Sequence, residues 1–284
     1  MSDVVVSVQA LFVHPIKSCA GVSLDESLLI ETGLEFDRAW MVVDPEGKFV
    51  TQRELPRMAL IQPSLKTYDL ILRAPGMLAL HLSLDTVEQP VRVTVWDDEV
   101  AAYDMGDLCA RWFSDFLGRE LRVVRFYPEQ KRLSDKRWAG DIDAENAFAD
   151  GFPLLVTSTA SLAELNRRLL EVGEQPVTMA RFRPNLVLDG LQAHDEDQLH
   201  ELCIDTADGP VLLRLVKPCS RCSIPDVDPQ TAATSHAVGD TLAGYRADAR
   251  LDGALSFGMN AVIVSGIECT LRPGQAVTTT WKFD

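Results

Sequence analysis

Residues 211–229 read VLLRLVKPCSRCSIPDVDP, and the interpretation of the whole chain starts from them. Residues 211–216 are mostly apolar and alternate in the manner of a β-strand. Prolines punctuate the rest, so we expect Cys219 and Cys222 on a loop at the end of that strand. A lysine and an arginine flank the two thiols. Nearby cations favour the thiolate, the form that attacks electrophiles and binds metals, so a reactive or metal-binding thiol is the first hypothesis.

Three other interpretations of the cysteine pair stay open: a dithiol redox couple, a structural zinc site and simple buried cysteines. Zinc needs about four ligands, and the nearest further candidates are His200 and Cys203. Both lie in a predicted strand, residues 199–206, where side chains three positions apart face opposite ways. A thioredoxin-like pair usually opens a helix, which Pro225 and Pro229 disfavour here.

The chain has 284 residues, 46% of them hydrophobic, enough for one large domain or two ordinary ones. Its 27 basic and 42 acidic residues give a net charge of −15, which argues against nucleic acid or an anionic membrane as a partner. No apolar run is long enough to span a bilayer, and the first residues lack the features of a secretory signal. With six cysteines in this length, we expect a cytoplasmic protein with free thiols.

The first half of the chain is predicted to consist mainly of short strands, which suggests a barrel or a sandwich. The alternating residues 91–96 and the acidic turn after them predict a β-hairpin. Apolar residues at helical spacing follow, and Gly118 is predicted to end that helix. A charged stretch with little pattern is interpreted as a connector or a surface lid. The predicted strands are 4–13, 24–30, 39–43, 58–62, 70–72, 91–96 and 100–103; the helix covers 108–117 and the connector 127–150.

In the second half, a strand at 152–156 runs into a helix whose start is lined with hydroxyl groups. Ser161 and Glu164 have the spacing of a capping box. Helix N-termini present free N–H groups and favour anions, although ordinary capping explains the same residues equally well.

Several cations and amides stand near predicted strand ends. Lys17 is the only formal charge between residues 3 and 25, so its head either reaches solvent or meets an anion. Arg38 and Arg53 resemble it, although surface ion pairs would explain them adequately. Arg181, Arg183 and Asn185 precede the predicted strand 186–188, and Asn260 lies in a further one. In a strongly acidic protein this pattern favours a pocket for one phosphorylated heterocycle.

Seven stretches together resemble one family, the MOSC-domain proteins with an N-terminal MOSC β-barrel domain, and in particular the mitochondrial amidoxime reducing components and their bacterial relatives. The resemblance covers nearly the whole chain. The stretches are residues 14–18, 37–40, 51–53, 152–155, 160–166, 182–185 and 218–222 with 227–229.

The resemblance implies a mainly β or α+β fold. It implies a β-barrel-like N-terminal domain at 1–125 and, at 126–284, a MOSC domain built as a mixed barrel with peripheral helices. It also implies a pyranopterin molybdenum cofactor in the cleft between them. By position Cys222 matches the thiolate ligand of molybdenum, Cys219 matches a second, non-ligating cysteine, and Asp228 matches an acid near the metal, a second catalytic candidate. The implied cofactor-binding residues are Lys17, Ser18, Arg38, Arg53, Ser158, Ser161, Arg183, Asn185 and Asn260.

The implied activity is the reduction of N-hydroxylated compounds, namely N-hydroxylated bases, amidoximes and hydroxylamines. Electrons would come from a separate flavin or iron–sulfur protein. A non-catalytic carrier of molybdenum cofactor or sulfur is the alternative. The resemblance also carries the family's associations with detoxification and pyridoxal phosphate binding. Two departures stand out: Pro225-Asp226 replaces two threonines, expected to change the shape and charge of the substrate face, and Met259 replaces a glutamine.

Overall fold

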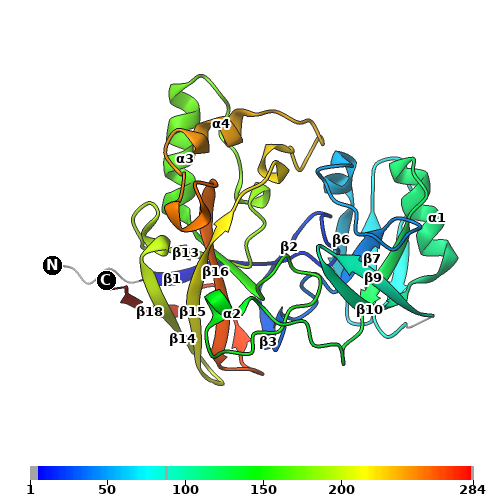
Figure 1. Ribbon diagram of the computed structural model, residues 1–284, viewed down its shortest axis with the longest axis horizontal. Coiled ribbons are helices and arrows are strands. Elements are labelled where there is room, and N and C mark those ends of the chain that lie inside the picture. The colour runs from blue at the N-terminus through cyan, green and yellow to red at the C-terminus, as the bar shows by residue number, and fades with distance from the viewer. Residues whose placement is uncertain (1–5, 87–88, 283–284) are drawn as a thin grey trace.

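The computed structural model describes residues 6–86 and 89–282, and strands make up most of the ordered structure. Figure 1 shows two parts, a barrel with helices above it and a smaller part made of short strands and α1 (Gly106–Leu117). The expectation of a mainly β fold with a mixed barrel and peripheral helices is confirmed.

The larger part is a closed barrel of seven strands, in which pairing of the first strand with β13 closes the sheet. Neighbouring strands are antiparallel except β12 and β13, which run parallel. Apolar residues from alternate strand positions fill the interior. The strands are β1 (Val6–Val13), β12 (Leu154–Ser158), β13 (Leu186–Asp189), β14 (Leu199–Thr206), β15 (Gly209–Ser220), β16 (Ser256–Ser265) and β18 (Ala276–Trp281).

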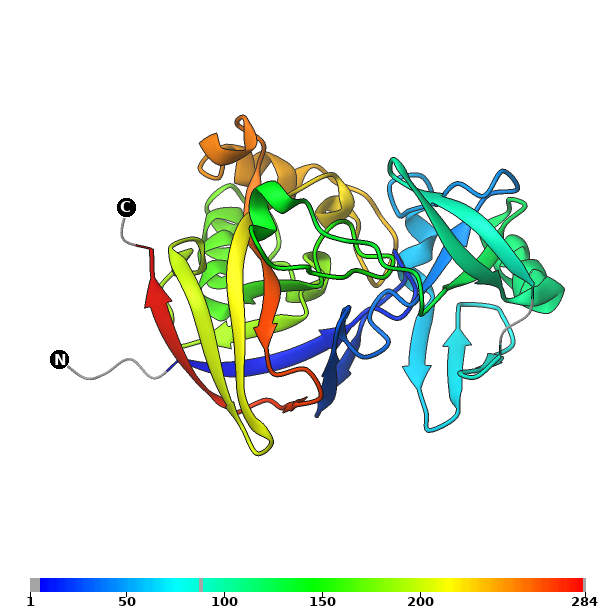
Figure 2. The ribbon, with the colours of Figure 1, turned by 60° about the horizontal axis from the view of Figure 1, so that its bottom comes forward.

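Shorter strands extend the barrel at one end. β2 (Val22–Leu24) pairs with β1, and β3 (Ser27–Ile30) lies between β4 (Gly33–Leu34) and β17 (Thr270–Leu271). Figure 2 shows β1 leaving the barrel toward the smaller part. The first strands of the chain therefore pair with its last ones. The predicted domain boundary at 125/126 stays a prediction. The first described strand, β1, belongs to the barrel because it pairs with β13 and β18.

The smaller part contains a four-stranded and a three-stranded sheet with α1 (Gly106–Leu117) packed against them. Gly118 ends this helix in the left-handed conformation, as the sequence predicted. The predicted hairpin is confirmed as β9 and β10. The four-stranded sheet has β5 (Trp40–Val43), β11 (Arg122–Phe126), β10 (Asp98–Asp104) and β9 (Pro90–Val95), and the other has β6 (Gln62–Leu65), β7 (Asp69–Arg73) and β8 (Leu80–Ser83).

The predicted strand at 58–62 is wrong, because residues 56–60 form a 3-10 helix, η1 (Pro56–Leu60). Proline is well suited to the first turn of a helix, where its missing N–H is not needed. The remaining helices are α2 (Lys136–Ala139), α3 (Thr159–Glu171) and α4 (Ala237–Ala243), with 3-10 turns η2 (Met179–Arg181), η3 (Asp195–Asp197), η4 (Ile224–Asp226) and η5 (Ala249–Leu251).

The charged stretch 127–150 connects the two parts but is not a surface lid. Phe148 is fully buried against the four-stranded sheet, and the buried Arg132 donates to the carbonyls of Ala147 and Ala149. Polar side chains such as Arg132 bind backbone carbonyls within the same stretch. The stretch is therefore charged and shows no regular pattern of hydrophobic residues. Its last residues therefore reach the functional site in a fixed path.

Candidate functional site

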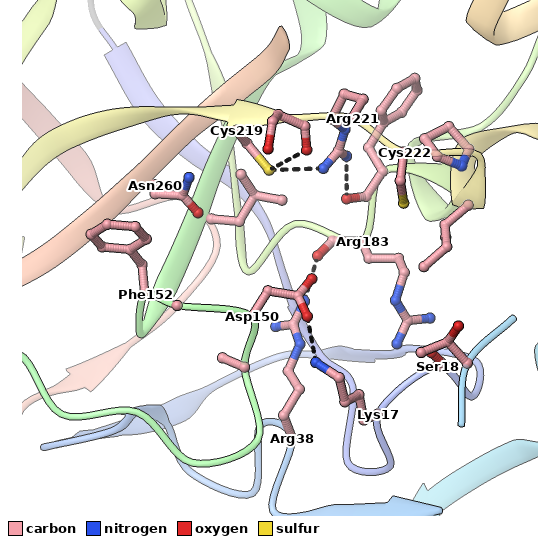
Figure 3. Close-up of a pocket in the computed structure, with 18 of the residues that line it drawn as sticks. Lys17, Ser18, Arg38, Asp150, Phe152, Arg183, Cys219, Arg221, Cys222 and Asn260 are labelled. Atoms are coloured by element: carbon pink, nitrogen blue, oxygen red, sulfur yellow. Dashed lines mark hydrogen bonds and ion pairs between the residues drawn. The ribbon is translucent and has the colours of Figure 1, made fainter. Parts of the chain in front are cut away.

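A pocket lies where the barrel meets the smaller part. Figure 3 shows the two thiols of the Cys-x-x-Cys motif on one wall and cationic side chains on the opposite wall. Its lining contains six basic side chains and, of the described residues, one acid. The lining therefore carries a net positive charge, whereas the whole chain is strongly negative, and this favours an anionic ligand. The seven charged residues are Lys17, Arg38, Arg53, Asp150, Arg181, Arg183 and Arg221.

The thiol wall is the end of β15 and the loop after it. β15 continues to Ser220, so Cys219 lies in the strand and not on the predicted loop, and only Cys222 lies beyond it. The ladder with β16 is irregular on both sides of Pro218, which allows a proline in this strand. The Cys222 side chain is exposed in the pocket, as a metal ligand or nucleophile must be.

Arg221 ties the thiol wall together. Its Nη1 donates to Cys219 Sγ at 3.0 Å and its Nη2 to the Phe182 carbonyl at 2.6 Å. Its Nε is buried and has no hydrogen-bond partner among the described residues. A buried, unpaired donor on a pocket wall is unusual in folded proteins and indicates a ligand-binding position.

Phe182 fixes the other arginines of its motif. Its ring stacks on Phe257 at 3.9 Å between centroids, within the helical layer, and the residues on either side, Arg181 and Arg183, line the pocket. Arg183 donates to the Cys19 carbonyl at 2.5 Å. Burial, reinforced by the charge of Arg38, lowers its pKa to about 10. A desolvated cation bonded to a carbonyl is well placed to accept an anion.

Lys17 and Asp150 form an ion pair on the opposite wall. The ammonium donates to Asp150 Oδ1 at 2.5 Å and to the Phe148 carbonyl at 2.8 Å. The lysine side chain is 7% exposed, whereas the aspartate side chain is 72% exposed, so the carboxylate faces open space. Burial lowers the pKa of Lys17, and the carboxylate opposes that effect. Trp96 also donates to Asp150 Oδ1, at 3.3 Å.

Arg38 is the centre of a buried network. Its guanidinium donates to Asp37 Oδ2, to Asn185 Oδ1 at 3.0 Å and to the Arg183 carbonyl at 2.9 Å. Asn185 also accepts from Leu155 N–H at 3.0 Å and is 1% exposed, so its amide acts by fixing Arg38. The network therefore connects the segments around residues 38, 155 and 184 at the pocket.

Three lining residues other than glycine have a left-handed backbone: Ser18 at φ 67°, Arg38 at 49° and Arg183 at 56°. Such conformations cost of order 1–3 kcal/mol each and cluster at functional sites. Their gathering in one pocket supports a ligand-binding role for it.

The structure brings most of the predicted site residues together. The pocket lining includes Lys17, Ser18, Arg38, Arg53, Arg183, Asn185, Asn260 and Cys222. Asp228 is outside the lining and instead pairs with Arg181 at 3.0 Å, so it acts on the pocket through that arginine. The roles of all these residues stay predictions.

Ser158 and Ser161 are not in the pocket. Both are fully buried, and their hydroxyls donate to the buried Glu196, at 2.9 and 2.6 Å. The predicted capping box is also wrong, because the N-cap of α3 is Ser158, three residues earlier, and Ser158 Oγ accepts from Ser161 N–H. Glu164 is therefore too far along the helix to cap it and pairs with Arg168.

Glu196 makes the stability of the fold depend on pH. Burial raises its pKa, so ionising this carboxyl costs more in the folded state than in the unfolded chain. Its contribution is therefore fully present below the ordinary glutamate pKa and is lost as the pH rises through the raised value. In urea unfolding between pH 4.5 and 8, we expect wild type to lose stability relative to Glu196→Gln as pH rises. The matched control Glu171→Gln, on the exposed end of α3, should follow wild type; parallel curves for all three proteins would contradict the assignment.

Asp226 does not line the pocket, so the expected change of charge at the substrate face stays a prediction. Asp226 is buried, and its Oδ1 accepts from Gly239 N–H at 2.9 Å, in the first turns of α4. Pro225 does line the pocket and changes its shape. Met259 lies in the barrel core, away from the lining.

Two features were missed from sequence: Asp150, and the Trp96 indole that donates to it. Arg181, predicted with Arg183 to suit a phosphate, and Arg221, predicted to lie beside the thiols, both line the pocket. Asp150 ends a stretch without pattern, and nothing local indicated it. Among the described residues, no group of three or more His, Cys, Asp or Glu side chains could hold a metal ion, so structural zinc gains no support.

Comparison with known proteins agrees with the architecture. Residues 5–120 match the MOSC N-terminal beta barrel domain and residues 143–278 the MOSC domain. Mitochondrial amidoxime reducing component 2 of Rattus norvegicus is 35% identical over 84% of this chain and 72% of its own length. Mitochondrial amidoxime-reducing component 1 of Homo sapiens is 34% identical with the same coverage. The chain therefore belongs to the family of MOSC-domain proteins with an N-terminal MOSC β-barrel domain, as its motifs indicated.

A second kind of relative is a longer protein that matches this chain over part of its length. Molybdenum cofactor sulfurase of Homo sapiens is 28% identical over 96% of this chain but only 32% of its own length. In the part of the chain that the structure describes, no helix is long and apolar enough to cross a membrane.

Proposed function

We propose that this protein is a molybdenum-cofactor-dependent reductase of N-hydroxylated compounds. The observation that carries the proposal is one pocket with an exposed thiol, Cys222, on one wall and cations on the other. The relatives named amidoxime reducing components point to the same chemistry.

The residues fit a phosphate-bearing pterin with a soft metal. Cys222 supplies a thiolate, the donor type that soft metals prefer. Lys17, Ser18, Arg38 and Arg183 would hold the phosphate and the pterin, and Asn185 would act through Arg38. Arg53 and Asn260 would contact the ligand at the edges of the lining. When bound, the molybdenum supplies two-electron redox chemistry at the N–O bond.

The chain's own contribution is binding, orientation and control of charge. The Arg221 contact with Cys219 Sγ holds the thiol wall in shape, and the buried Arg38 network fixes the opposite wall. A preorganised cationic site loses little energy when an anion enters, because its groups need not reorient. Asp228 would act by positioning Arg181.

A carrier of molybdenum cofactor or sulfur is the second candidate, since part of a molybdenum cofactor sulfurase is similar to nearly the whole of this chain. Turnover separates the two. Protein from a host that makes the pterin should contain about one molybdenum per chain and reduce an amidoxime with reduced viologen as electron donor. Bound cofactor without turnover would favour the carrier, and zinc without pterin fluorescence after denaturation would contradict both.

Further parts of the proposal rest on the sequence alone. They are a separate flavin or iron–sulfur electron donor, a cytoplasmic location and a role in detoxification. Pyridoxal phosphate binding likewise stays a prediction.

A further inference from the structure

Arg181 lies on the same side of the pocket as the candidate metal ligand. Its Nη1 donates to the Pro225 carbonyl at 3.1 Å and its Nη2 to Asp228 Oδ2 at 3.0 Å. Both acceptors belong to the segment just after Cys222. The side chain is 12% exposed and lines the pocket, so its position is fixed while one edge faces the cavity.

Arg181 has N–H groups that find no hydrogen-bond acceptor among the described residues. A guanidinium has five N–H groups, and among the described residues only two of those of Arg181 have an acceptor. Its one acid, Asp228, also accepts from the N–H groups of Gln230 and Thr231, at 2.8 and 2.9 Å. That carboxylate is therefore shared, and Arg181 can take a second anionic partner.

Three of the other five cations in the lining already have an acid or a thiol as partner, whereas among the described residues Arg183 bonds a carbonyl and Arg53 a hydroxyl. Lys17 pairs with Asp150, Arg38 pairs with Asp37, and Arg221 bridges a thiol and a carbonyl. Lys17 and Arg38 lie on the wall opposite the thiols. A ligand phosphate held there would leave Arg181 for a different anion, close to the thiolate where the substrate must react.

We propose that Arg181 makes the pocket selective for N-hydroxylated substrates with an anionic group, a carboxylate or a phosphate, near the N–OH group. This inference rests on the proposed reductase function. Guanidinium groups bind both anions through paired hydrogen bonds, which a lysine cannot reproduce.

The test compares matched substrates with and without the anion. One pair is benzamidoxime and 4-carboxybenzamidoxime; the other is N4-hydroxycytidine and its 5′-monophosphate, so the two anions are distinguished. In Arg181→Gln, the kcat/KM ratio of anionic to neutral substrate should fall about 10- to 100-fold, the range for a hydrogen bond to a charged group. Arg181→Lys should give an intermediate ratio, because it keeps the charge without the fork.

Asp228→Asn is the decisive companion, because it keeps the oxygen that accepts from the backbone but removes the competing charge. Asp228→Asn should raise the kcat/KM ratio of anionic to neutral substrate. If the ion pair of Arg181 and Asp228 were purely structural, Arg181→Gln and Asp228→Asn would both slow all substrates alike. Calorimetry with the corresponding amidine products should show the same order without turnover. Equal ratios in wild type and Arg181→Gln would overturn the inference and leave the reductase intact. No reduction of any substrate by wild type would instead contradict the proposed function.

Discussion

Cys222→Ser should lose its molybdenum and with it the reduction of amidoximes. Cys222 is exposed in the pocket, and a serine hydroxyl is a weaker metal ligand than a thiolate because it stays protonated. Loss of an outer-shell partner typically costs 10- to 100-fold, so loss of the ligand itself should lower kcat/KM by more than about 100-fold. Metal analysis of purified variants, with pterin fluorescence after denaturation, measures the loss directly.

Cys219→Ser is the matched control for this experiment. Cys219 Sγ accepts a hydrogen bond from Arg221, which a serine oxygen can also accept. We therefore expect Cys219→Ser to keep most of its molybdenum. A dithiol or zinc site would use both cysteines, so equal damage from the two substitutions would contradict the proposed metal thiolate.

The motifs predicted the pocket better than they predicted its charge pairs. Short motifs place cations and thiols at strand ends, and those strand ends meet when the barrel closes through β1 and β13. Asp37, the partner of Arg38, is its neighbour in the sequence and lies in the same motif, whereas Asp150, the partner of Lys17, comes from a distant stretch without a regular pattern. Ion pairs between distant segments depend on tertiary contacts, and one sequence alone does not contain them.

The two serines at the start of α3 show the opposite failure. Hydroxyls at a helix start are typical both of anion binding and of capping, and local pattern does not separate the two. Glu196, more than thirty positions away in the sequence, decides between them because it accepts hydrogen bonds from both hydroxyls. A buried acid that needs donors thus converts a candidate ligand site into part of the core.

Arg38→Met should lower the free energy of unfolding by about 3–5 kcal/mol, the cost of leaving a buried charge without its partner. The Asp37 side chain is 1% exposed, and its carboxylate depends on Arg38 and on the His14 N–H. The same change removes the donor that Asn185 and the Arg183 carbonyl share. Urea unfolding measures the effect, and cofactor content should fall with it because the wall opposite the thiols loses its support.

Arg53→Met removes one positive charge from the same pocket without breaking a buried pair. Arg53 is exposed, contacts the Thr51 hydroxyl at 3.2 Å and lies over the Trp96 ring at 4.8 Å. Exposed contacts of this kind contribute roughly 0.5–1 kcal/mol, so stability should change little. The difference between the two variants isolates the Arg38 network from the general loss of positive charge. Equal destabilisation would mean that Arg38 contributes through its charge alone and that the network does not hold the pocket.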